Sequence, residues 1–249
     1  MRIAVFSDIH ANRVALEAVL AVVAELQPDA IWCLGDVVGY GPEPEACVEI
    51  IAKRADLCLA GNHDLAVAGL VPLDDFSPDA AAAVRWQQPR LSPVALHWLA
   101  QRQPRLVQAG ITLAHGSPRD PIWEYVLDAG AAAANLEYFD TQLCLIGHSH
   151  LAIAWRLQRQ DEGTWVWVRL ERRPPGETLD LTTTHRWLLN PGSVGQPRDG
   201  DPRASFALLD TEALTWTWHR VPYDVAAVDA AIRAAGLPWR LGRRLYSGQ

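Results

Sequence analysis

The chain has 249 residues, of which 49% are apolar and 20% are charged, and this composition predicts a soluble globular protein with a sizeable hydrophobic core. Its formal charge of -7 at pH 7 argues against a nucleic-acid polymer as partner, because such binding needs clustered Lys and Arg side chains that neutralise phosphates. A small anionic substrate is compatible with that charge, since a bound metal ion can reverse the local field.

Neither a leader nor a membrane segment is predicted. The first residues, MRIAVFSDIH, contain only a short apolar run before Asp8, which is typical of a strand and not of a signal peptide. No run approaches the roughly 18 apolar residues that a membrane helix needs. The four cysteines are scattered in apolar segments without a CxxC pair, which favours buried reduced thiols and a cytoplasmic location.

The first part of the chain alternates strands with helices. Residues 2–7 are β-branched and aromatic and end at a polar cluster, as a buried parallel strand does. Residues 12–26 place apolar side chains at the spacing of a helix face, and Asn12 is in position to cap that helix. A strand, a helix and a strand follow at 29–36, 44–55 and 57–64. This alternation predicts a parallel sheet covered by helices.

The remaining segments predict a helical insertion and further strands. Between residues 65 and 104, short helical pieces separated by prolines indicate an insertion over the sheet edge. Strands at 111–117 and 142–150 enclose helical segments around 121–139. Residues 151–221 contain strand-like runs separated by turns, which predicts a second, largely antiparallel sheet. Residues 224–235 are predicted to form a closing helix. We expect one domain over residues 1–249.

Polar motifs follow the predicted strands at the positions where open α/β sheets place ligands. These motifs are SDIH (7–10), GDVVGYGP (35–42), GNHD (61–64), AHGS (114–117) and GHSH (147–150). Their candidate metal donors are Asp8, His10, Asp36, Asn62, His115, His148 and His150. Carboxylate, amide and imidazole donors together suit Mn, Fe, Co or Zn better than Ca or Cu. Because this set exceeds the needs of one tetrahedral zinc, two metal ions that share a carboxylate are the economical interpretation.

The ordered set D-x-H, GD, GNHD, H and GH-x-H resembles the calcineurin-like metallophosphoesterase superfamily over residues 8–150. The stretches GDVVGYGP, HGSP and NPGSVGQPRDGDPRASFALLD are similar to one branch of small bacterial and archaeal phosphoesterases, which extends the match to about residue 210. The resemblance implies an α/β fold, a four-layer α/β/β/α sandwich of two mixed β-sheets flanked by helices, with a dinuclear metal site. Ala11 stands where many relatives have glycine; a small side chain there is expected to cost little, although the loop is expected to differ from theirs.

Carried over by position, the resemblance implies a role for each motif residue. The first metal is held by Asp8, His10 and His150, and the second by Asn62, His115 and His148, with Asp36 as the bridge. His63 matches the general acid, and Asp64 the acidic partner that orients it. The two divalent ions are expected among Mn, Fe, Zn, Co and Ni, with Mn favoured. A hydroxide bridging them would attack phosphorus in line while His63 protonates the leaving alkoxide.

Substrate contacts are predicted at the rim of this site. Asn12 and Arg13 are candidates to hold phosphate oxygens. Tyr40 either stacks on a nucleobase or packs in a Gly/Pro turn. Arg198 and Arg203 either bind a distal phosphate or are solvated loop arginines. The basic end, residues 239–249, is interpreted as a solvated tail.

The expected substrate is a small phosphodiester or nucleotide, dinucleoside polyphosphates included, on the basis of the branch resemblance and Tyr40. Two alternatives stay open: a phosphomonoesterase that acts on phosphoserine or phosphothreonine in proteins, and a non-catalytic interaction scaffold of the same fold. The physiological substrate, the native metal and the oligomeric state are left open.

Overall fold

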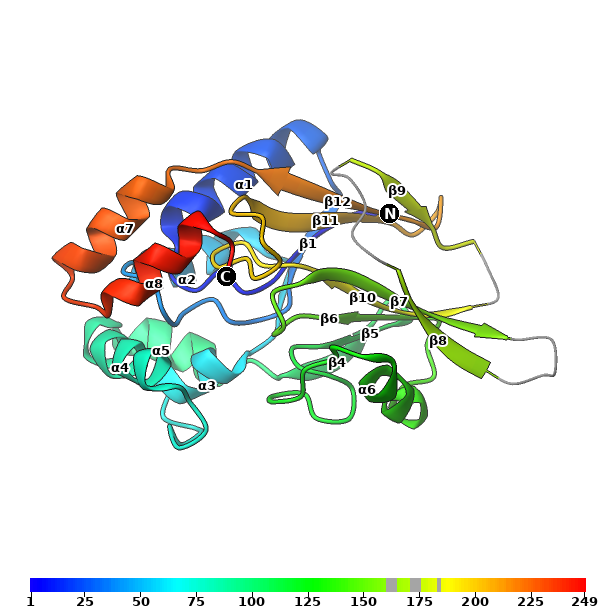
Figure 1. Cartoon of the computed structure of the whole chain (residues 1–249), viewed down its shortest axis with the longest axis horizontal. Helices are drawn as coiled ribbons and strands as arrows, with labels where there is room; N and C mark the ends of the chain where they lie inside the picture. Colours follow the sequence, from blue (N-terminus) through cyan, green and yellow to red (C-terminus); the bar gives the residue numbers. More distant parts are fainter. Residues whose placement is uncertain (160–164, 171–175, 183–184) are drawn as a thin grey trace.

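The computed structural model describes residues 1–159, 165–170, 176–182 and 185–249. Within them, two mixed β-sheets face each other and helices lie against their outer faces (Figure 1). The predicted four-layer α/β/β/α arrangement is therefore confirmed.

The first sheet has six strands in the order β3-β2-β1-β11-β12-β9. Their bounds are Leu57–Cys58 (β3), Ala30–Cys33 (β2), Arg2–Phe6 (β1), Ala204–Asp210 (β11), Thr215–Val221 (β12) and Thr178–Asp180 (β9). Strands β1, β2 and β3 are parallel, whereas β11, β12 and β9 extend the sheet by antiparallel pairs. The parallel half therefore directs the carboxyl ends of three strands to one edge.

The second sheet also has six strands, in the order β4-β5-β6-β10-β7-β8. Their bounds are Arg105–Gln108 (β4), Ile111–Ala114 (β5), Leu143–Ile146 (β6), Arg186–Pro191 (β10), Ala152–Arg159 (β7) and Trp165–Leu170 (β8). Strands β5, β6 and β10 are mutually parallel in the centre of the sheet. This sheet too presents adjacent carboxyl ends at one edge.

The described helices are α1 (Arg13–Leu26), α2 (Pro44–Arg54), α3 (Asn62–Val67), α4 (Pro78–Gln87), α5 (Pro93–Ala100), α6 (Ala129–Ala134), α7 (Val225–Ala234) and α8 (Trp239–Arg243), with 3₁₀ turns η1 (Gln88–Arg90), η2 (Leu136–Tyr138) and η3 (Arg244–Tyr246). Helix α1 begins where the Asn12 side chain accepts a hydrogen bond from the main chain of Ala15, so the predicted cap is confirmed. None of these helices has the length and apolarity needed to cross a bilayer, as far as the described residues extend.

Three layers of apolar side chains fix the packing of the sandwich. Val5 and Trp32 of the first sheet meet Leu113 and Trp187 of the second in a core that water does not reach. Leu16 of α1 packs on the outer face of the first sheet, and α6 covers the outer face of the second. Because both faces of the parallel strands are buried, these strands are apolar throughout and not alternating.

Two sequence predictions are wrong in detail. Residues 151–221 do not form a second sheet of their own: β7, β8 and β10 join the second sheet, whereas β9, β11 and β12 join the first. The cause is a long-range pairing, since β11 lies antiparallel to β1 with Ala207 opposite Val5. Residues 121–128 are not helical, because the Asp120 carboxylate accepts hydrogen bonds from Ile122 and Trp123 in a local turn.

Candidate metal centre

The predicted donors converge in one crevice between the two sheets. They are supplied by the segments that follow β1, β2 and β3 in one sheet and β5 and β6 in the other. All are buried: Asp8, His10, Asp36, Asn62, His115, His148 and His150. Residues up to 142 positions apart in sequence therefore meet because parallel strands end at the same edge.

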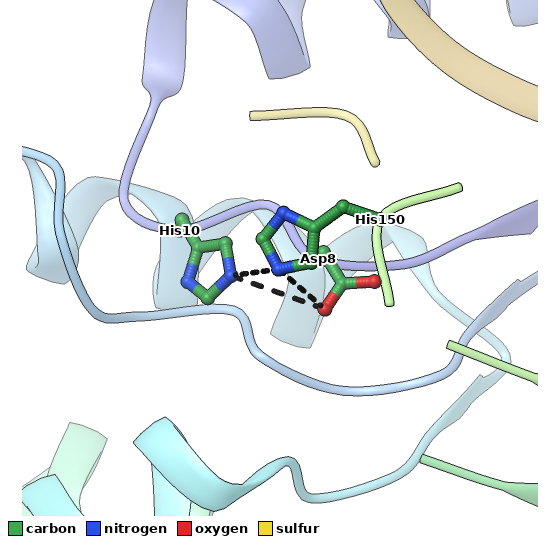
Figure 2. Close-up of side chains that lie close together, drawn as sticks. All are labelled: Asp8, His10 and His150. Carbon is green, nitrogen blue, oxygen red and sulfur yellow. Dashed lines mark hydrogen bonds and ion pairs between the residues drawn. The ribbon is translucent and has the colours of Figure 1, made fainter. Parts of the chain in front are cut away.

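Three overlapping groups of donors lie close enough to hold a cation. One of them, His10, Asp36 and His63, takes a donor from each of the other two, which share no residue. The ligand atoms of Asp8, His10 and His150 are within 4.8 Å of one another (Figure 2). Those of Asp36, His115 and His148 satisfy the same distance. The Asn62 amide oxygen lies 3.3 Å from His115 Nε2, and so belongs beside the second group.

Asp36 belongs to the group of His115 and His148 and also faces His10 of the other group. Its Oδ2 atom is 3.6 Å from His10 Nε2 and 3.5 Å from His115 Nε2. Its other oxygen accepts a hydrogen bond of 2.9 Å from the main-chain N–H of His63. One carboxylate therefore faces both groups and also fixes the start of helix α3.

Main-chain carbonyl groups orient three of the imidazoles. Nδ1 of His10, His115 and His150 lies 3.0, 2.9 and 2.5 Å from the carbonyl oxygens of Val38, Leu34 and Gln196, respectively. A carbonyl oxygen only accepts, so each Nδ1 carries a proton, and in the neutral ring Nε2 presents a lone pair to the crevice. His148 is reversed, since its Nε2 donates to the carbonyl of Trp123 over 3.2 Å and leaves Nδ1 as the ligand atom.

The donor atoms of this site face one another in a way that suits a bound cation better than hydrogen bonds among the side chains. His10 Nε2 and His150 Nε2 are 3.1 Å apart, although the proton of each neutral ring is already committed to a carbonyl. Oδ1 of Asp8 is buried, has no hydrogen-bond partner among the residues that the structure describes, and lies 3.4 Å from His150 Nε2. Lone pairs that face each other in a dry site repel unless a positive charge lies between them, and orientation of the imidazoles by carbonyl groups is typical of metal sites.

Burial keeps most of these imidazoles neutral. It holds the pKa of His10 and of His150 well below the usual range and lowers the pKa of His148 to about 3. Neutral imidazole is the form that binds a metal. His115 differs: burial opposes its charged form, but the adjacent Asp36 carboxylate outweighs burial and raises the pKa of His115 to about 9.

The pKa values of the Asp8 and Asp36 carboxyl groups shift in opposite directions. Burial raises the pKa of Asp8 to about 7, and the negative charge of Asp36 adds to that effect. Burial acts in the same direction on Asp36, but the imidazoles of His115 and His63 outweigh it and hold the pKa of Asp36 well below its usual range. The crevice therefore carries negative charge at Asp36 in the absence of a cation.

The main chain is strained where the donors lie. Asp8, His10, Asp36, His148 and His150 all have φ between 52° and 61°, in the left-handed region that non-glycine residues avoid. Ala11 has φ 52°, so the alanine in the first loop adopts the conformation that suits glycine. Such clusters of strained residues persist only where the surrounding structure over-determines them, as at ligand-binding sites.

His63 lies beside the centre, but Asp64 does not orient it. The Asp64 oxygens each accept a hydrogen bond of 3.0 Å, from the main-chain N–H groups of Val38 and Gly61, and Nδ1 of His63 has no partner among the described residues. The predicted contact between these side chains is therefore wrong, because Asp64 is occupied in joining two loops. The His63 ring packs between Tyr40, at 4.4 Å, and Phe76, at 5.0 Å between ring centroids.

A cavity of about 760 Å³ opens onto the donors. Its wall includes His63, His148 and His150, and also Tyr40 and Arg198. Nη2 of Arg198 donates to the Tyr40 hydroxyl over 3.3 Å, and the Tyr40 ring lies 4.6 Å from that of His10. The predicted substrate contacts at Tyr40 and Arg198 are thus in place to meet a ligand.

Three other predicted substrate contacts are not brought to the cavity. Asn12 is occupied on both sides, as the cap of α1 and as a donor to the carbonyl of Gly195 over 2.9 Å. Arg13 is paired with Glu43 at 2.7 Å on the exposed side of α1. Arg203 is held by Asp201, also at 2.7 Å. In the structure these three side chains have other partners, because proximity in sequence to a donor loop does not fix the direction of a side chain.

Several residues of the wall carry no signal in the sequence. Tyr125 stacks on His148 with ring centroids 4.0 Å apart, and Trp123 and Phe76 continue the aromatic surface. Arg244 reaches the cavity from η3, so the basic end of the chain is not simply a solvated tail. None of them stands in a recognisable motif, and only the fold brings them to the donors.

Comparison with known proteins agrees with this geometry. Residues 1–214 match the family described as the calcineurin-like phosphoesterase superfamily domain. An uncharacterized protein of Methanocaldococcus jannaschii is 34% identical over 258 residues, which cover 99% of this chain and 98% of that protein. The crystal structure of a metallophosphoesterase from Sphaerobacter thermophilus is 44% identical, with a TM-score of 0.86 over 100% of this chain and 99% of that one. A hypothetical protein from Pyrococcus horikoshii shares the fold, with a TM-score of 0.78, 21% identity and coverage of 100% and 98%.

Proposed function

The chain belongs to the calcineurin-like phosphoesterase superfamily and is a phosphoester hydrolase, and from this premise we propose that it hydrolyses small phosphodiesters or nucleotides at a dinuclear metal centre. The observation that carries the proposal is the pair of donor groups on either side of Asp36. A single cation would leave one of these groups without a role.

Two divalent ions, with Mn favoured, supply charge that neutralises phosphate oxygens and makes water acidic when they are bound. In this proposal Asp8, His10 and His150 hold one ion, and Asn62, His115 and His148 hold the other. Asp36 contacts both. Members of this family depend on divalent metals, which supports the assignment.

His63 is proposed to protonate the oxygen of the leaving group. Burial lowers the pKa of His63 to about 4, so the free imidazole is neutral at pH 7. A phosphate ester bound beside the ring adds negative charge, which favours the protonated imidazole. Asp36 positions His63 through its main chain, by the hydrogen bond of 2.9 Å to the N–H group.

The cavity supports a small substrate. Its volume of about 760 Å³ lies within the range of roughly 300–1,000 Å³ that is common for small-molecule sites. Tyr40 and Arg198 are proposed to contact the base and the phosphate of such a ligand. The four cysteines are buried and free, which supports a reducing compartment and hence the cytoplasm as the proposed location.

The first test is hydrolysis of bis-p-nitrophenyl phosphate with added Mn²⁺. We expect Asp36→Asn to abolish turnover, since both donor groups lose a carboxylate. We expect His63→Ala to lower kcat by about 10²–10⁴-fold for a phenyl diester, whose leaving group needs a proton, and by less for the p-nitrophenyl diester. Histidine 97 lies outside the centre, so His97→Ala is the matched control.

The outcomes separate the alternatives. Turnover that is indifferent to both Asp36→Asn and His63→Ala would remove the proposed mechanism. Faster hydrolysis of p-nitrophenyl phosphate than of the diester would favour a phosphomonoesterase that acts on phosphoproteins. If the metal-loaded protein hydrolysed neither ester, an interaction scaffold of the same fold would be the better description.

A further inference from the structure

Two arginines from distant parts of the chain line the same cavity. Arg198 lies in the loop that follows β10, and its main-chain N–H donates to the carbonyl of His150 over 3.4 Å. Arg244 begins η3 after helix α8. Both side chains contribute to the wall of the cavity, which also includes the metal donors.

The guanidinium group of Arg198 is not neutralised by the protein. Its Nη2 atom donates to the neutral groups Gln196 Oε1, at 3.0 Å, and Tyr40 Oη, at 3.3 Å, and a further side-chain hydrogen bond links Arg198 to the neutral hydroxyl of Tyr125. Its Nε atom is buried and has no hydrogen-bond partner, and no carboxylate pairs with Arg198 among the residues for which the structure gives positions. A buried cationic donor without a partner is costly, which indicates that an anionic ligand completes it.

The fold fixes Arg244 in the wall of the cavity that Arg198 also lines. Leu241 and Leu245, on either side of Arg244, are buried against Val228 and Ile232 of α7. The Arg244 Nε donates to the main-chain oxygen of Gln249, which fixes the base of the guanidinium group. Arg244 is half-buried, and the packing of these leucines fixes the segment that carries it.

The two arginine segments are also tied to each other. The main-chain N–H of Gly200 donates to the carbonyl of Gly248 over 2.9 Å. Gly248 has φ +62°, and a Cβ atom there would lie 2.7 Å from the main chain of Asp201. This close approach joins the loop of Arg198 to the segment of Arg244. Burial lowers the pKa of the Arg244 guanidinium, and the positive charge of Arg198 lowers it further.

Two positive groups are thus brought together in a protein of net charge -7. Of the carboxylates in the cavity wall, Asp36 belongs to the metal donors and Asp75 forms no ion pair with either arginine in the described part of the chain. Like charges that line one cavity disfavour the empty protein, and a phosphate group relieves that repulsion with charge-assisted hydrogen bonds.

We propose that Arg198 and Arg244 form a subsite for a second phosphate group, so that the substrate is a nucleotide with at least two linked phosphates. The inference rests on the proposed function of the same cavity. One phosphate reacts at the metal donors, and the next along the chain binds the arginine pair. Tyr125, Trp123 and Phe76 extend the aromatic wall beyond Tyr40, the residue proposed to contact the nucleobase. Arg244 is a specificity-determining residue and takes no part in bond breaking.

The subsite is tested by binding, separately from hydrolysis. Isothermal titration calorimetry of the full chain in EDTA compares AMP with ADP, which differ by one phosphate. We expect ADP to bind the wild type about 10–100-fold more tightly than AMP, and Arg244→Gln to remove this preference. Arg243→Gln is the matched control, because Arg243 is exposed on the same segment, its guanidinium lies over the Tyr246 ring, and it is not in the cavity wall.

Three results would overturn the subsite: equal affinity of the wild type for AMP and ADP, an ADP preference that survives Arg244→Gln, or an equal loss of AMP and ADP binding. Arg198→Gln is the second variant if Arg244→Gln does not fold, as judged by circular dichroism, and the same loss of preference is expected. Failure of the proposed function and failure of the subsite give different results. A wild type that prefers ADP through Arg244 but hydrolyses no ester keeps the subsite, whereas one that hydrolyses the diester without the preference refutes the subsite alone.

Discussion

At the scale of single residues, Asp64 illustrates how a buried carboxylate stabilises a site without contact with substrate. It lies in the first turn of α3, is fully buried, and accepts one hydrogen bond from each of two loops, at Val38 and Gly61. Burial raises the pKa of Asp64 to about 7, and the nearby charge of Asp36 adds to that shift. The two loops carry Asp36 and Asn62, so Asp64 determines where these donors lie.

We expect Asp64→Asn to destabilise the protein. An asparagine has one acceptor oxygen, so one main-chain N–H is left facing an NH₂ group, at a cost of about 1–3 kcal/mol in the free energy of unfolding. Urea denaturation measures this change. The control is Asp224→Asn at the exposed cap of α7, where asparagine caps about as well as aspartate. Unchanged stability together with lost hydrolysis would mean that Asp64 acts through the chemistry instead.

The donors were predictable from the sequence, and the substrate contacts mostly were not. Each donor lies within a few residues of a strand end, where the local main chain alone directs its side chain to the sheet edge. Arg244 lies 94 residues beyond His150, in no motif, and reaches the cavity only because α8 packs on α7. Long side chains in loops are directed by their partners, such as Glu43 for Arg13, and no local pattern reveals those partners.

At the scale of the elements, helix α4 supports the loop that follows β2. The buried Gln87 accepts a hydrogen bond from the main chain of Gly39 and donates one to the carbonyl of Gly41, each over 2.7 Å. Gly39 has φ +95°, and a Cβ atom there would overlap the His63 ring. The helical insertion therefore holds the general-acid candidate in position.

We expect Gly39→Ala to reduce hydrolysis of the diester by about 100-fold, because a displacement of about 1 Å in a reacting group has that order of effect. The matched control is Gly110→Ala. Gly110 has φ +73° but nothing within 4 Å of the added methyl group, so only backbone strain of about 1–2 kcal/mol is expected there, without loss of activity. Equal activity of the two variants in the Mn²⁺ assay would contradict the packing argument.

At the scale of the whole molecule, the donors join the two sheets. Asp8 and Asp36 come from the first sheet, and His115, His148 and His150 come from the second. The sequence predicted two sheets but divided the strands wrongly, because β11 pairs with a strand about 200 residues earlier, and no local pattern encodes such a pairing. The donor motifs identify the crevice even where the sheet assignment fails.

Metal binding is therefore expected to stabilise the sandwich. Mn²⁺ at about 100 times its dissociation constant adds about 2.7 kcal/mol, which corresponds to a rise of about 5–10 °C in Tm for a chain of this size. Differential scanning calorimetry with EDTA and then with Mn²⁺ measures the shift. Asp36→Asn should remove most of it, and His97→Ala should retain it. An equal shift in the two variants would place the metal elsewhere.

The left-handed main chain at Asp8, His10, Asp36, His148 and His150 has a consequence for the history of such proteins. Each of these five positions favours glycine on conformational grounds, so these five donors are kept at the expense of folding free energy. In a descendant that is no longer selected for hydrolysis, replacement of these donors by glycine increases the stability of the fold. Inactive relatives with an intact fold are thus an easy evolutionary outcome of this architecture.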